Sequence, residues 1–135
     1  MSGHRDLRLL LKNLEPELLG GEFVFVSLPD ATPDTVRDLS PIGIFEEDEG
    51  KSLIVTKSAA DLAGLKYEGR FRQITLRVHS SLHAVGLTAV IADACAEHEI
   101  PINVVAAFHH DHLFVPAESA EAALEILRRL AFSNG

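Results

Sequence analysis

The chain has 135 residues, of which 47% are hydrophobic, and a formal net charge of −8. This length suits one compact domain or two small repeats, and the hydrophobic content is typical of a folded protein rather than a disordered one. The 12 lysines and arginines are scattered and form no basic stripe, which argues against nucleic acid as a partner.

The first half of the chain contains an alternating strand pattern and one well-marked helix start. Residues 6–13 predict a short N-terminal helix. Val24, Val26 and Leu28 then lie at alternate positions and predict a strand. Thr32 and Pro33 are residue types favoured at the N-cap and at the first helical position, so we expect a short helix over residues 33–39.

The second half has a clearer pattern. Residues 72–79 alternate and predict a strand, and residues 86–98 carry an apolar stripe at helical spacing that ends before Pro101. Residues 102–108 and 113–116 are apolar and predict two further strands. Residues 118–130 predict a helix with acids in its first turn and arginines in its last. The expected order is therefore β-α-β-β-α.

The same order occurs in both halves. Pro41 and Pro101 are sixty residues apart, and so are the similar pairs Leu53 and Leu113, Val55 and Val115, and Ala60 and Ala120. The leading strands align at an offset of fifty, so the first helix of the first half must be the shorter one. Matches at several positions indicate an internal duplication.

Each β-α-β-β-α repeat lacks a fourth strand. In antiparallel sheets with helices on one face, the missing strand can be supplied when strands of one repeat pair with strands of the other. We therefore expect an α+β protein with two ferredoxin-like halves, placed side by side or exchanging a strand. The expected division is an N-terminal extension over residues 1–20, a first repeat over 21–66 and a second repeat over 70–131.

The strand alternation also predicts which residues point away from the helices. A two-residue turn at His110 and Asp111 would place His109 across from His112. The sheet surface away from the helices would then carry Phe23, Phe25, Phe45, Ile54, Val105 and Phe114. A solvent-facing sheet does not normally carry so many phenylalanines, so we expect a second copy of the chain to cover this surface.

The histidines of the stretch FHHDHLF have three readings. His109 and His112 facing each other, with Asp111 nearby, could share a metal ion, but zinc requires a third protein ligand. His79 is the one candidate that the sequence offers for that third ligand. The first repeat builds the same hairpin with the letters EGKS, so the turn needs no histidine to form. A polar hairpin tip is the favoured reading, ahead of a ligand contact or a metal site.

No catalytic constellation is expected. The stretch Glu46 to Glu49 is an acidic hairpin tip, and Ser80, Ser81 and His83 lie where a strand turns into a helix, so capping explains them. The sequence contains no GxSxG, HExxH or Walker motif.

The cellular compartment follows from three features. The N-terminus is too mixed in charge for a secretory signal, and no apolar run approaches the roughly 18 residues of a membrane span. One cysteine, Cys95, excludes an internal disulfide. We expect a cytoplasmic protein without a membrane partner.

The second repeat resembles the ACT domain, an amino-acid-sensing regulatory module. Its stretches VGLTAVIADACAEHEIPINVVAAF and HLFVPAESAEAALEILRRL carry the resemblance, with Gly86 at the family's loop glycine and Ile100 and Ile102 around the strand start. The whole chain is similar to small stand-alone bacterial proteins with tandem ACT-like domains. His83, Val85 and Pro101 depart from residues that are frequent in the family at these places.

The resemblance implies a ligand site built from the loop before the helix and from the second strand of a neighbouring domain. The matching positions are Ser80, Ser81, His83, Val85, Gly86, Leu87, Ile102, Asn103 and Val104. It implies a non-enzymatic module that binds an amino acid as a homodimer, without cofactor. A ligand-free interaction protein and a small metal-dependent enzyme built on the histidine hairpin remain alternatives.

Overall fold

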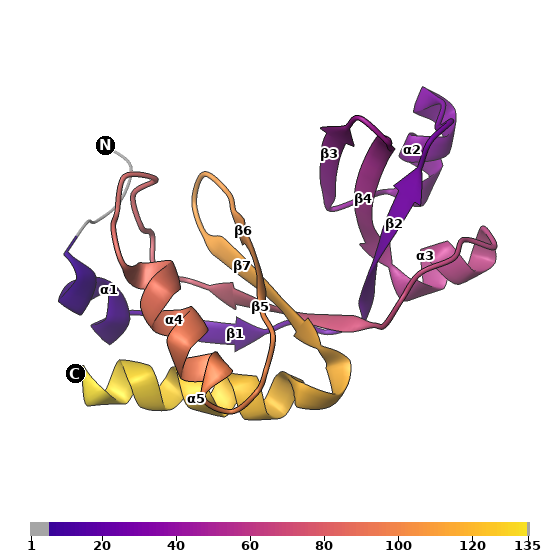
Figure 1. Cartoon of the computed structure of the whole chain (residues 1–135). Helices are drawn as coiled ribbons and strands as arrows, with labels where there is room; N and C mark the ends of the chain where they lie inside the picture. The colour runs from indigo at the N-terminus through magenta and orange to yellow at the C-terminus, as the bar shows by residue number, and fades with distance from the viewer. Residues whose placement is uncertain (1–5, 135) are drawn as a thin grey trace. The chain divides into compact units, whose positions relative to one another are not determined.

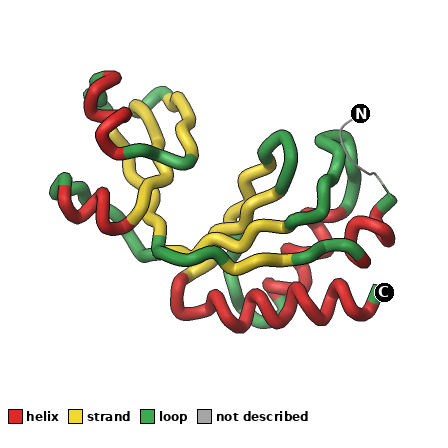
Figure 2. The backbone as a smooth tube through the Cα atoms, turned by 180° about the vertical axis from the view of Figure 1, so that it is seen from behind, coloured by secondary structure: helices red, strands yellow, loops and turns green. Residues whose placement is uncertain are grey.

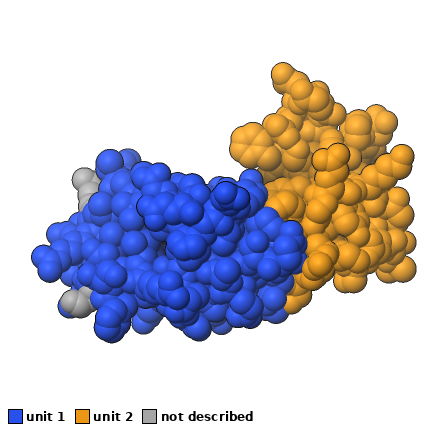
Figure 3. All heavy atoms as spheres, turned by 60° about the horizontal axis from the view of Figure 1, so that its bottom comes forward, with its two compact units in different colours: residues 1–20, 72–135 blue, residues 21–71 orange. Residues whose placement is uncertain are grey.

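A computed structural model describes residues 6–134 of the chain. They form two compact units, which Figure 3 shows in different colours. In the described part of the chain, unit 1 combines residues 6–20 with residues 72–134. Unit 2 is the segment between them, residues 21–71. The expectation of an N-terminal extension outside the repeats was therefore wrong, because residues 6–20 fold as part of the second repeat.

Unit 2 has the element order expected for the first repeat (Figure 1). Its elements are β2 (Phe23–Leu28), α2 (Pro33–Leu39), β3 (Gly43–Glu47), β4 (Gly50–Thr56) and α3 (Lys57–Leu62). The short helix begins at Pro33, and the hydroxyl oxygen of Thr32 accepts a hydrogen bond from the Thr35 amide. The prediction of this helix and its cap is confirmed.

The strands of unit 2 lie in the order β3-β4-β2 and are antiparallel. Phe71, the last residue of unit 2 and the first of β5, pairs with Phe23 at the other edge of β2. Within unit 2 this one residue pair is the only contact of β2 with β5 among the described pairs, so the first repeat keeps three strands of its own.

Unit 1 contains the remaining elements, seen from the front in Figure 1 and from behind in Figure 2. They are α1 (Leu7–Lys12), β1 (Pro16–Leu18), β5 (Phe71–Leu76), α4 (Leu87–Ala96), β6 (Asn103–Ala106), β7 (Asp111–Pro116), the 3-10 turn η1 (Ala117–Ser119) and α5 (Ala120–Ser133). Its strand order is β1-β5-β7-β6. Four strands in this order, with α4 between β5 and β6 and α5 after β7, make a ferredoxin-like arrangement, so the predicted fold class is confirmed.

Strand β1 was not predicted. It pairs antiparallel with β5, placing Pro16 opposite Leu76 and Leu18 opposite Ile74. Glu17, between them, forms an ion pair with Arg77. Three residues are too few to show an alternating pattern, so sequence periodicity could not identify this strand. It supplies the fourth strand that the second repeat lacks.

Each unit has its own hydrophobic core. In unit 1 the helices α1, α4 and α5 contact one another, and α5 also contacts β1 and β7. Leu10 and Leu14, from the N-terminal segment, are fully buried in this core beside Ile91 and Leu127. The smaller core of unit 2 lies between its strands and the helices α2 and α3, around Val24, Val26, Leu53 and Val55. None of the helices within residues 6–134 is long and apolar enough to cross a membrane.

The β6–β7 hairpin has a different register from the predicted one. Val105 pairs with His112 and Ala106 with Asp111, so His109 does not face His112. The turn is longer than two residues, and the amide of Ala107 donates to the carbonyl of His110 to close it. Phe114 pairs with Asn103 instead of the predicted Ala107, so the register differs by an even number of residues. An even difference leaves each side chain on the same face of the sheet. Val105 and Asn103 therefore still share one face, as the alternation predicted.

The expected apolar sheet surface is only partly exposed. Phe114 is 2% exposed and Phe23 is buried within the single chain, so neither is free to contact a second copy, and these two assignments were wrong. Phe45 is 71% exposed, and Phe25 and Val105 are also exposed, whereas Ile54 is half-buried. Phe25 packs edge-on against Phe71 with ring centres 5.2 Å apart.

Candidate functional site

A cavity of about 190 Å³ lies in unit 1 between the segment that joins β5 to α4 and the β6–β7 hairpin. Its lining residues are Ser80, Ser81, Leu82, Ala84, Gly86, Leu87, Thr88, Ala106 and Asp111. Four of them, Ser80, Ser81, Gly86 and Leu87, belong to the site that the sequence predicted.

Gly86 shapes the entry to helix α4. Its φ of 99° lies in the left-handed region, and a Cβ atom there would come within 3.2 Å of Leu7 Cδ2. Glycine is the residue that adopts this backbone without strain. As the N-cap it also offers no side-chain acceptor, so no side chain satisfies the first amides of this ten-residue helix.

The two serines before Gly86 organise the cavity wall. Ser81 is buried, its hydroxyl oxygen accepts a hydrogen bond from the His83 amide, and its carbonyl accepts one from the Ala84 amide. Ser80 donates from its hydroxyl to the carboxylate of Asp111 over 3.3 Å. This bond ties the segment before α4 to the start of β7.

Asp111 is the charged residue among the five cavity residues that were not assigned to the site from the sequence; the other four are Leu82, Ala84, Thr88 and Ala106. With the assumed two-residue turn it was a hairpin-tip residue or an oxygen ligand for a metal ion. The observed register places it opposite Ala106, and both residues line the cavity. It is the one charged residue among the described residues that line this cavity. Only the turn length, which the sequence does not specify, could have revealed this.

The other predicted site residues do not line this cavity. Val85 is 82% exposed and His83 is also exposed. Ile102, Asn103 and Val104 lie at β6, and the side-chain amide of Asn103 donates to the Phe114 carbonyl at 3.5 Å. These three strand residues were assigned because the resemblance implies a ligand site shared with a neighbouring domain. Their part in such a shared site remains a prediction.

The histidines of the hairpin fall into two groups. His112 is held from β5, where Thr75 Oγ1 lies 2.9 Å and Gln73 Nε2 lies 3.2 Å from its Nδ1. Burial, followed by the charge of His110, lowers the pKa of His112. His79, His109 and His110 form the second group, with His79 ring centres 5.5 and 6.4 Å from the other two. Within residues 6–134, no three His, Cys, Asp or Glu side chains are arranged to hold a metal ion.

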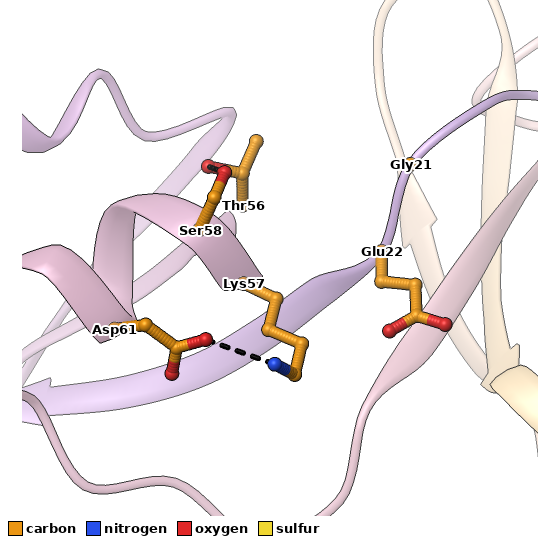
Figure 4. Close-up of a pocket in the computed structure, with 6 residues that line it drawn as sticks. All are labelled: Gly21, Glu22, Thr56, Lys57, Ser58 and Asp61. Carbon is orange, nitrogen blue, oxygen red and sulfur yellow. Dashed lines mark hydrogen bonds and ion pairs between the residues drawn. The ribbon is translucent and has the colours of Figure 1, made fainter.

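Unit 2 contains a second hollow, of about 320 Å³, at the start of α3 (Figure 4). Lys57 points toward Asp61, and their ion pair spans 2.9 Å. The hydroxyl of Tyr67 donates to the same carboxylate over 2.6 Å, and Glu22 pairs with Arg70. The hydrogen bond from Tyr67, followed by that from Lys57, lowers the pKa of Asp61. Because these charges are paired with one another, this hollow is a weaker candidate for a ligand site.

ACT-domain family models match the chain twice, over residues 2–72 and over residues 68–129. The chain belongs to the ACT-domain family. The tandem ACT arrangement that the sequence suggested is thus confirmed. No curated protein matches the chain.

Solved structures include one similar ACT-like protein of the same size. VC0802 from Vibrio cholerae, described as a "Protein of Unknown Function" and "Possible Transport Protein", is 44% identical, with a TM-score of 0.85, and the match covers 94% of this chain and 97% of that chain. Atu0741 from Agrobacterium tumefaciens is 18% identical, with a TM-score of 0.71, over 86% of this chain and 87% of that one.

The fold also occurs in a protein described as a regulatory subunit of aspartate kinase. The regulatory subunit of aspartate kinase from Thermus thermophilus is 16% identical, with a TM-score of 0.60, and the match covers 85% of this chain and 95% of that chain. At this identity the likeness shows a shared fold.

Proposed function

We propose that this ACT protein is a non-enzymatic regulatory module of the cytoplasm that binds a free amino acid in the unit 1 cavity and acts as a homodimer. The single observation that carries the proposal is that one cavity is lined by two walls of complementary charge preference. One wall is the start of α4 at Gly86, and the other is the carboxylate of Asp111.

The wall at α4 suits a carboxylate. The first amides of a helix have no partner within the helix, and the helix dipole favours negative charge at this end. Leu87 and Thr88, in the first turn of α4, both line the cavity, and Gly86 leaves room for a ligand to approach the backbone.

The wall at Asp111 suits an ammonium group. Hydrogen bonds between charged groups are short and strong, and Asp111 has a neutral partner, Ser80, rather than a basic one. Between these walls the lining is mostly apolar, from Leu82, Ala84, Leu87 and Ala106. A carboxylate, an ammonium group and a small side chain are the three parts of an α-amino acid.

Two further observations support a regulatory role. The described cavity contains serines, a threonine and one acid, without a histidine base or a nucleophile paired to one. A protein of similar fold is described as the regulatory subunit of an aspartate kinase.

A thermal-shift screen with the twenty amino acids tests the proposal. A ligand that binds only the folded state raises the melting temperature by mass action, so at least one amino acid should raise it in a dose-dependent way. Asp111→Asn should abolish the shift, whereas Asp93→Asn, an exposed acid on α4, should retain it. The absence of a shift with all twenty amino acids would refute amino-acid sensing.

A ligand-free interaction module is the second candidate, and the exposed apolar residues of unit 2 favour it. Ile42, Ile44 and Phe45 at the edge strand β3 are 51%, 51% and 71% exposed. Such an edge is a common surface for another chain to pair with. In this case amino acids would leave the melting temperature unchanged, while substitution of Phe45 would disrupt an assembly.

A further inference from the structure

Three histidine rings lie close to one another in unit 1, next in the chain to residues that line the cavity. His79 follows β5, and His109 and His110 lie in the β6–β7 turn. The ring centres of His79 and His109 are 5.5 Å apart, those of His79 and His110 are 6.4 Å apart, and those of His109 and His110 are 6.3 Å apart. Nε2 of His79 is buried and has no hydrogen-bond partner among the described residues. We call these three residues the histidine cluster.

The histidine cluster is joined to the cavity by its neighbours in the chain. His79 precedes Ser80, and His110 precedes Asp111, and Ser80 and Asp111 both line the cavity and are hydrogen-bonded to each other. In addition, Nδ1 of His110 lies 3.5 Å from the carbonyl oxygen of Val78. A change in the charge or position of these rings therefore acts on the two residues that form the proposed ammonium site.

The titratable and charged groups near the cluster in the chain come from the hairpin and from β5 with its extension. On the hairpin, Asp111 is the acid and His112 is the next titratable group. On β5 and its extension there is Arg77, which is paired with Glu17 of β1 and whose charge lowers the pKa of His112. Asp111 is the carboxylate that directly follows the cluster in the chain.

We infer that the histidine cluster makes ligand binding proton-linked, so that acidification weakens the affinity of the cavity for an amino acid. The inference rests on the proposed function. Histidine is the side chain whose charge ordinarily changes between pH 5 and 8. A positive charge gained by the cluster on acidification would oppose the binding of a second positive charge, the ligand's ammonium group, at the neighbouring residues Ser80 and Asp111. By reciprocity, a bound amino acid disfavours protonation of the cluster.

The test uses the full chain and whichever of the twenty amino acids gives the largest thermal shift at about pH 7.5. Its dissociation constant is measured calorimetrically at about pH 7.5, 6.5 and 5.5, a range across which histidine changes charge. We expect the constant to rise about tenfold or more from the highest to the lowest pH, a coupling of ordinary size. The variant carrying His109→Gln and His110→Gln should bind at the highest pH and keep a nearly constant affinity.

The matched control is His98→Gln, which removes an exposed histidine at the end of α4, outside the cluster. It should retain the wild-type pH dependence. Binding that is independent of pH in the wild type, or equally dependent in the double variant, overturns the inference and leaves the proposed function standing. A screen without any binding at about pH 7.5 overturns both.

Discussion

Leu18 lies directly across from Ile74 in the ladder between β1 and β5, so two segments from opposite halves of the chain share one sheet. The pairing completes unit 1, because its own segment from β5 to α5 supplies three strands and β1 supplies the fourth. The N-terminal segment is consequently part of the core that positions the cavity.

The N-terminal helix should therefore be essential to stability. Leu10→Ala, at a fully buried position of α1, is expected to lower the free energy of unfolding by about 2–5 kcal/mol, through lost burial and the cavity left behind. Urea denaturation followed by circular dichroism measures this. Leu9→Ala, one residue earlier and 45% exposed, should change stability far less. Equal effects of the two substitutions would contradict the role of α1 in the core.

Gly86→Ala should both destabilise the protein and impair the cavity. A non-glycine residue with this positive φ costs on the order of 1–3 kcal/mol, and the added methyl group would press on Leu7. The free energy of unfolding is again the measurement. Gly20→Ala, in the same unit, is the control, because a Cβ atom there meets nothing within 4 Å. Unchanged stability of Gly86→Ala would show that the left-handed turn is not required.

Phe45→Ser should lower the molar mass of the particle in solution from that of a dimer to that of a monomer. Phe45 is the most exposed of the phenylalanines assigned to the sheet surface of unit 2, and a homodimer that covers this surface would bury it. Size-exclusion chromatography with light scattering gives the mass. Leu62→Ser, on α3 and 92% exposed, should leave it unchanged. A wild-type chain that is monomeric at micromolar concentration would refute the homodimer.

The stability of the fold should decrease on mild acidification through His112. Its pKa is lowered in the folded state, first by burial, so below about pH 6.5 the unfolded chain binds more protons than the folded one. Stability is therefore retained above the unfolded pKa and lost as the pH falls through it toward the lower folded value. Urea midpoints between about pH 7.5 and about pH 5 should fall less steeply in His112→Gln than in the wild type. Identical pH profiles would show that folding does not lower the pKa of His112.

Tyr67→Phe should raise the pKa of Asp61 toward its ordinary value. The hydrogen bond from Tyr67 is the largest cause of the lowered pKa, and the ion pair with Lys57 would remain. Carbon-detected NMR of the carboxyl group follows the titration directly. A pKa that stays as low in the variant would assign the effect to Lys57 instead.

Much of this fold is visible in the sequence because its elements are locally determined. Thr32 and Pro33 mark the start of α2, the apolar stripe marks α4, and the even alternation of β6 and β7 places Leu113 on the core face even though the register was misjudged. The duplication follows from matching apolar positions, which need no knowledge of distant contacts. The glycine turn at Gly86 and the serines before it also follow from local chemistry.

Only the tertiary structure decided that β1 completes the sheet of unit 1 and which residues share the cavity. The pairing of Leu18 with Ile74 and of Phe71 with Phe23 joins residues far apart in the chain, and a three-residue strand carries no periodic signal of its own. The place of Asp111 depends on the length of one turn, because each residue added to a hairpin loop moves every cross-strand pair. Non-local pairing and loop length are properties of the packed chain, and short-range sequence patterns do not encode them.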